Sequence, residues 1–178
     1  MDEAMWRDAL NANGAFRNCT LTVRSGYETI VVNLDLGEGA LAIHMAGEGD
    51  VIYTREAVYV NAGSGWSYMS VPDPAKEYEE QVESTIATVA LFFDCYNEFT
   101  YDEGNDVYIA ASVTVTDPTT SEPMTCTNVT QRFVQYDNHR YRLVEVAYTA
   151  DDETGTIRIS AYDETEVAVP ELPPQEIA

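Results

Sequence analysis

One long segment of the chain, from Asp73 to Tyr96, repeats its apolar residues at helical spacing. Asp73 can cap the free N–H groups of a first turn, and the fixed φ of Pro74 suits the first helical position. The apolar side chains recur at intervals of three and four, which places them along one side: Tyr78, Val82, Ile86, Val89, Phe93 and Tyr96. The pattern predicts an amphipathic helix whose apolar side needs a sheet to cover it.

Before this helix, apolar and polar residues alternate, which is typical of half-buried strands. Two Gly-Glu-Gly triplets, starting at Gly37 and Gly47, provide the backbone freedom at positive φ that tight hairpins need. The alternation predicts an antiparallel meander of six strands: Phe16–Arg24, Glu28–Leu36, Leu41–Met45, Val51–Tyr53, Ala57–Val60 and Trp66–Met69.

After the helix, a polar turn at 101–106 precedes a second alternating region. Val107, Ile109, Val113 and Val115 are expected to share one face, with a small irregularity at Ala111. Further strands are expected at Thr127–Tyr136, Arg140–Thr149, Ile157–Ala161 and Val167–Val169. At the other end of the chain, Asp2–Asn13 reads as a short helix that Gly14 ends.

These elements predict an α+β fold, in which a strongly curved antiparallel sheet, an unclosed half-barrel, wraps around the central amphipathic helix. No change in composition marks a second domain, so residues 1–170 are predicted to form one domain and residues 171–178 a proline-rich tail. A chain of 178 residues has the length of a single domain.

The amino-acid composition excludes some classes of binding partner. The chain carries 31 acidic and 9 basic side chains, a net charge of −22 that repels nucleic acid and anionic lipid head groups. No apolar run approaches the ~20 residues that cross a bilayer. The acidic start, Met1-Asp2-Glu3, lacks the positive charge of an export signal, although a chain whose signal had been removed would look the same.

The sequence contains few residues that could form a catalytic or metal-binding site. His44 and His139 are the only histidines, and Ser64 lies in a glycine loop that lacks the nucleophile-elbow motif. We therefore expect that the protein has no enzymatic activity. The acidic clusters at 102–106 and 151–153 lack EF-hand spacing, so we expect neither a metal nor a cofactor. Cys19, Cys95 and Cys126 allow one disulfide in any of three pairings, with one thiol left over.

The chain ends in a predicted strand at 156–163 that is followed by Val167-Ala168-Val169-Pro170. This ending and the order of the elements before it resemble the LolA/LppX-like superfamily of exported lipoproteins and lipoprotein carriers, which includes lipoproteins of Gram-positive bacteria. In that superfamily, a curved sheet clasps helices, and the space between them holds acyl chains or other apolar ligands. The chain departs from the acylated members because no cysteine precedes Cys19.

The resemblance implies an exported bacterial protein of the cell surface or envelope, with its signal and anchor removed. We expect a carrier or sensor for a hydrophobic small molecule or lipid, with membrane contact only through a lipid anchor absent from this sequence. The alternative is a cell-envelope interaction module with a filled core. The expected ligand-contacting residues are Ile30, Val32, Leu34, Ile43, Met45, Trp66, Ile86 and Phe93.

Overall fold

The structure is a computed structural model that describes residues 18–117, 120–137 and 140–172. Its helical elements are α2, Pro74–Ala90, and the 3₁₀ helix η1, Phe93–Glu98. Its strands are β1 Asn18–Ser25, β2 Glu28–Asp35, β3 Ala40–Met45, β4 Gly49–Thr54, β5 Val58–Asn61, β6 Trp66–Met69, β7 Thr100–Asp102, β8 Val107–Thr116, β9 Pro123–Asp137, β10 Arg140–Ala150 and β11 Glu153–Ser160. The predicted helix Asp2–Asn13 lies outside the described residues.

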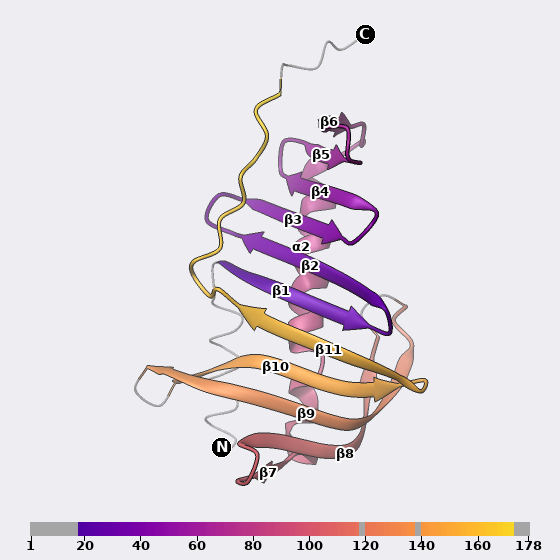
Figure 1. Ribbon diagram of the computed structural model, residues 1–178, viewed down its shortest axis with the longest axis vertical. Coiled ribbons are helices and arrows are strands. Elements are labelled where there is room, and N and C mark those ends of the chain that lie inside the picture. The colour runs from indigo at the N-terminus through magenta and orange to yellow at the C-terminus, as the bar shows by residue number, and fades with distance from the viewer. Residues whose placement is uncertain (1–17, 118–119, 138–139, 173–178) are drawn as a thin grey trace.

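The strands form one antiparallel sheet in the order β6-β5-β4-β3-β2-β1-β11-β10-β9-β8-β7. Each half of the sheet is a meander of sequential hairpins, and the pairing of β1 with β11 joins the two halves (Figure 1). The edges β6 and β7 lie at opposite ends, so the sheet does not close. The predicted unclosed antiparallel sheet with one helix is confirmed.

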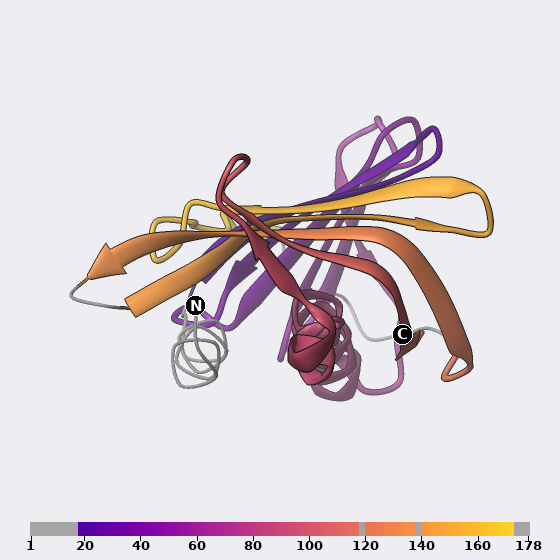
Figure 2. The ribbon, with the colours of Figure 1, turned by 90° about the horizontal axis from the view of Figure 1, so that it is seen from below.

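Helix α2 passes across the strands on one side of the sheet, from the β6 end towards the β7 end (Figures 1 and 2). At its start, the Lys76 amide donates to the Asp73 carboxylate at 3.2 Å, as the capping pattern predicts. The helix ends at Ala90, earlier than expected, and the chain continues as η1, in which Cys95 has non-helical backbone angles.

The buried side of α2 differs from the predicted stripe at one position. Tyr78, Thr85 and Val89 are buried, whereas Ile86 is 37% exposed. At 100° per residue, Ile86 lies roughly 80° around the helix from Tyr78, while Thr85 lies only about 20° away. The prediction of Ile86 as a buried central residue was therefore wrong, because a threonine takes that place.

The strand register defines the side of the sheet that α2 covers, which we call the helix face. Directly paired residues of antiparallel strands point to the same side, and Leu34 pairs with both Cys19 and Leu41. These residues belong to the main core together with Tyr78, Val89 and Phe92 of the helical layer. The alternation in the sequence thus predicted this face of β2 and β3 correctly.

The second half of the sheet contains two departures from prediction. Thr100–Asp102 forms the edge strand β7, where a turn was expected. Ala110, Val113 and Val115 are buried but Ile109 is 40% exposed, so the buried positions change parity within β8. The change occurs opposite Asn128 of β9, whose φ of 51° breaks the regular alternation there.

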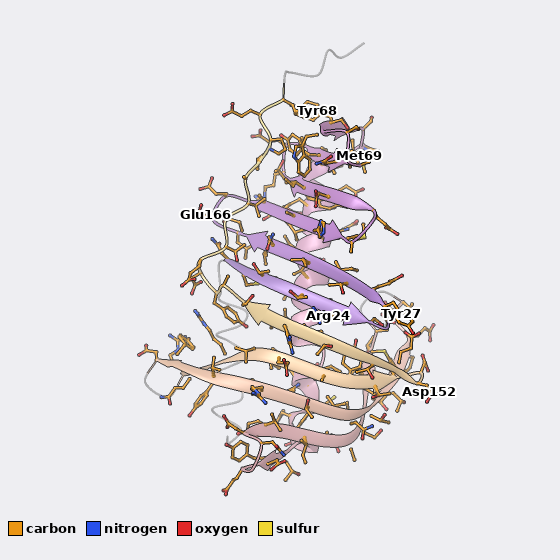
Figure 3. The ribbon with its side chains drawn as sticks, viewed as in Figure 1. Arg24, Tyr27, Tyr68, Met69, Asp152 and Glu166 are labelled. Atoms are coloured by element: carbon orange, nitrogen blue, oxygen red, sulfur yellow. The ribbon has the colours of Figure 1, made fainter. Side chains whose placement is uncertain are left out.

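The last described residues, 163–172, form no strand, contrary to the expectation for Val167–Val169. We call them the C-terminal strap, because they cross the opposite side of the sheet, the outer face. The Asn18 side chain donates to the Thr165 carbonyl at 2.8 Å, and the Val167 amide donates to the buried Asp35 carboxylate at 3.4 Å. Figure 3 shows Glu166 of the strap beside the margin of the sheet.

Candidate functional site

A pocket of about 480 Å³ opens between the C-terminal end of α2 and the β8–β9 end of the sheet. In Figure 2 this end of the sheet bends towards the side on which α2 lies. The residues that line the pocket are largely apolar or small: Ala87, Ala90, Leu91, Asp94, Cys95, Thr114, Val115, Thr116 and Pro123. Its volume lies in the range of small-molecule sites, about 300–1,000 Å³. The structure therefore has a pocket between helix and sheet.

A smaller pocket of about 170 Å³ lies at the hairpin end of β2 and β3. Ile30 and Met45, which pair across these strands on the helix face, contribute to its lining. Tyr27 also lines it, at the tip of the β1–β2 hairpin, and its side chain is fully exposed (Figure 3). Two of the predicted ligand-contacting residues thus meet at a pocket.

The structure brings most of the predicted ligand-contacting residues to the helix face. Ile30, Val32 and Leu34 alternate along β2, and β3 aligns its predicted residues with them: Ile43 with Val32 and Met45 with Ile30. Phe93 is 3% exposed and packs in the same core. Whether these residues touch a ligand stays a prediction.

Trp66 and Ile86 do not join that group. The register connects Trp66 to Asn61, then to Asp50 and His44, all on the outer face. Trp66 there packs against a second small core formed by Ala40, Ile52, Tyr59 and Val167. Placing Trp66 between sheet and helix was therefore wrong, because its strand exposes the opposite side, and Ile86 lies on the exposed flank of α2.

Gln131, a residue that sequence inspection did not single out, lies buried on the helix face. It is 1% exposed, and neither its amide oxygen nor its amide nitrogen has a hydrogen-bond partner. Its cross-strand neighbours are Val146 and Tyr108. The sequence does indicate this burial, because Val129, Gln131 and Phe133 alternate along β9 and the glutamine occupies a position where an apolar residue is expected.

The outer face carries the one histidine that the structure describes. His44 is exposed, and its Nδ1 atom lies 2.5 Å from an Asp50 carboxylate oxygen. Both residues line a pocket of about 170 Å³ beside Trp66 and the strap. Among the described residues of that lining there is no serine, threonine, cysteine or lysine, so the pair has no nucleophile beside it. His139 lies outside the described residues.

In the acidic cluster at 102–106, carboxylates are hydrogen-bonded to groups of the same turn. The Asp102 carboxylate accepts hydrogen bonds from the Asn105 side chain at 2.7 Å and the Gly104 amide at 2.9 Å, and these bonds lower the pKa of Asp102. Tyr101 donates to Asp106 at 2.7 Å. Within the described ranges, no group of three or more His, Cys, Asp or Glu side chains is placed to hold a metal ion.

All three cysteines are free thiols. Burial raises the pKa of Cys19 to about 12, with a further contribution from the nearby Asp163 carboxylate. Burial also raises the pKa of Cys126 to about 11, and the neighbouring Cys95 adds to this. Cys95, the one thiol that lines the helix–sheet pocket, is only partly buried.

These shifts predict a loss of stability at alkaline pH. Thiols of the unfolded chain ionise near their ordinary pKa of 9.0, whereas Cys19 and Cys126 stay neutral in the folded chain up to about 12 and 11. Their contribution is therefore complete below about pH 9 and is lost as the pH rises through the folded values. Urea denaturation between pH 8 and 11 should show falling midpoints, with a shallower fall in Cys19→Ala/Cys126→Ala; equal slopes would contradict the assignment.

No membrane-crossing helix is found in the part of the chain that the structure describes, since none is both long and apolar enough. No protein-family model matches the sequence, and no curated protein matches it either. Solved structures do match. LprF from Mycobacterium bovis is 12% identical, covers 94% of this chain and 95% of its own, and superposes with a TM-score of 0.51.

The Mycobacterium tuberculosis lipoprotein LppX is similar to the same degree. It is 14% identical, the match covers 96% of this chain and all of LppX, and the TM-score is again 0.51. Both likenesses span nearly the whole chain, so the resemblance to the LolA/LppX-like fold is confirmed. At these identities the comparison establishes the fold.

Proposed function

We propose that this chain is an exported carrier or sensor that holds a lipid-like or other apolar ligand between the helix face of its sheet and α2. One observation carries the proposal. The helix–sheet pocket of about 480 Å³ lies where the sheet of a lipoprotein-like fold meets the end of its helix.

The pocket suits an alkyl chain because the residues that the end of α2 contributes are small or apolar, Ala87, Ala90 and Leu91, with Asp94 and Cys95 of η1 beyond them. Val115 and Pro123 provide the opposite wall from the sheet. Burying one methylene group contributes about 0.8 kcal/mol, so ten buried carbons give a measurable affinity after the cost of association. The lining therefore supports an apolar guest more than a polar one.

Charge restricts the head group of that guest. The net charge of −22 disfavours free anionic lipids, so a neutral or cationic amphiphile, or the acyl chains of a bound lipoprotein, is favoured. A position in the bacterial cell envelope, reached by export and held by a lipid anchor, belongs to the same proposal. We propose no catalytic role, cofactor or nucleic-acid partner.

The test begins with native mass spectrometry of protein purified without detergent, followed by titration with a neutral fluorescent lipid. We expect a co-purifying mass or saturable uptake. Ala90→Phe, which fills the pocket from α2, should weaken uptake at least tenfold. Ser84→Phe adds the same ring at an exposed position of the same helix and should leave uptake unchanged.

Two outcomes would favour the interaction module instead. One is wild-type protein with neither a bound mass nor saturable uptake. The other is uptake that Ala90→Phe and Ser84→Phe reduce equally, because then the lipid would not occupy the helix–sheet pocket.

A further inference from the structure

The helix–sheet pocket carries a carboxylate without a counter-charge. Asp94 is the one charged side chain among the described residues that line the pocket, and the lining contains no lysine, arginine or histidine. Asp94 is exposed in the first turn of η1. Within the described part of the chain, no hydrogen bond or ion pair engages its carboxylate. The pocket therefore presents a negative group that no neighbouring cation neutralises.

The C-terminal end of α2 adds to this negative potential. The last carbonyl groups of a helix give its C-terminal end a partial negative charge, which lysine, arginine or histidine side chains in the last turn commonly offset. The last turn of α2 has no basic residue, and Ala87 and Ala90 of that turn line the pocket. The helix end and the Asp94 carboxylate thus both favour a positive group in the same place.

The arginines of the sheet do not supply that positive group, because they lie on its outer face. Four of them can be assigned to this face from the strand register: Arg24, Arg132, Arg142 and Arg158. Arg132 pairs with Glu145 and Glu145 with Arg158, and the same row continues through β1 and β2 to His44. Arg24 and Arg142 are each next to a core residue of the same strand, so they also point away from α2.

The thiol of Cys95, which lines the pocket too, responds to the carboxylates. Burial raises the pKa of Cys95, and the Asp94 and Glu98 carboxylates raise it further. A nearby negative charge disfavours a thiolate and favours a cation for the same reason, the sign of the Coulomb interaction. The charge of these side chains is therefore felt inside the pocket as well as at its rim.

We propose that the guest of the helix–sheet pocket is a cationic amphiphile, whose alkyl chain lies against Leu91 and Val115 and whose ammonium group pairs with Asp94. This inference rests on the proposed carrier function. It adds to that function the sign of the head-group charge and the residue that recognises it. A neutral head group would leave Asp94 unpaired, and an anionic one would be repelled by it.

The test compares two guests of equal chain length, dodecylammonium and dodecanol, below the concentrations at which they aggregate. Occupancy of the pocket is measured as protection of Cys95 from iodoacetamide by peptide mass spectrometry, since Cys19 and Cys126 are fully buried. The wild type should bind dodecylammonium more tightly. Asp94→Asn should reduce this preference roughly three- to fivefold and keep the affinity for dodecanol, which shows that the pocket is intact. Asp94→Glu keeps the carboxylate and should retain most of the preference.

Glu56→Gln is the matched control, because it removes the same charge from an exposed turn between β4 and β5. A general attraction of cations to a chain of net charge −22 should weaken equally in Glu56→Gln and Asp94→Asn, whereas recognition in the pocket should weaken in Asp94→Asn alone. Equal losses in the two variants, or equal binding of the two guests by the wild type, would overturn the inference and leave the carrier function intact. Failure of both guests to protect Cys95 would overturn both.

Discussion

Val89→Asp is expected to lower the free energy of unfolding by about 3–5 kcal/mol, because it introduces a carboxylate into the core without a cationic partner. Val89 is 4% exposed and packs in the main core between α2 and the sheet. Thermal unfolding followed by circular dichroism measures the change.

Ile86→Asp is the matched control, with the same charge on the same helix three residues earlier. Ile86 is 37% exposed, so its aspartate keeps water and the helix loses little. Isoleucine and aspartate also differ little in helix propensity, so we expect a change of under about 1 kcal/mol. Equal melting temperatures for Val89→Asp and the wild type would refute the packing of α2 on the sheet, and an equally large loss for Ile86→Asp would refute its orientation.

Gly155→Ala has the second large expected effect, a loss of about 1–3 kcal/mol from overpacking. Gly155 of β11 is buried opposite Tyr148 of β10. A methyl group added at Gly155 would come within 2.4 Å of the Tyr148 ring. The ring cannot withdraw freely, because its other neighbour is Phe92 of the helical layer, at 5.4 Å between ring centroids.

A companion substitution tests this cause. Tyr148→Leu removes the atoms that the new methyl group would meet, so adding Gly155→Ala to it should cost much less than adding it to the wild type. Gly104→Ala, in an exposed turn, should change stability by under about 0.5 kcal/mol. Urea denaturation gives all the midpoints, and an equal cost of Gly155→Ala in both backgrounds would exclude the clash.

The sequence predicted those parts of the fold in which a period is maintained over several residues. Ile30, Val32 and Leu34 alternate without interruption, so their shared face followed from sequence alone. The start of α2 followed from the chemistry of Asp73 and Pro74. In both cases the local preference and the final packing agree.

The predictions were wrong where the local sequence pattern does not determine which side of the sheet or helix a residue faces. Trp66 follows a glycine loop, so nothing in the sequence connects its parity to that of the preceding strands. Ile86 is apolar, but the rotation of the helix directs the smaller Thr85 towards the sheet in its place. Gln131 was overlooked because inspection followed apolar residues, and a buried polar residue is recognised only when its partners can be counted.

The pairing of β1 with β11 has a consequence for the order in which the chain folds. Leu21 pairs with Ile159, so the strand that begins the described sheet meets the strand that ends it at the middle of the sheet. Contacts of such long sequence separation form slowly, because a large loop must close before they contribute.

During synthesis from the N-terminus, β1 to β6 therefore emerge as a meander whose first strand has no partner on one side. That open strand is a template for pairing with another chain until β11 arrives. We expect the half-made chain to need protection from association, and the last hairpin to be the step that ends this need.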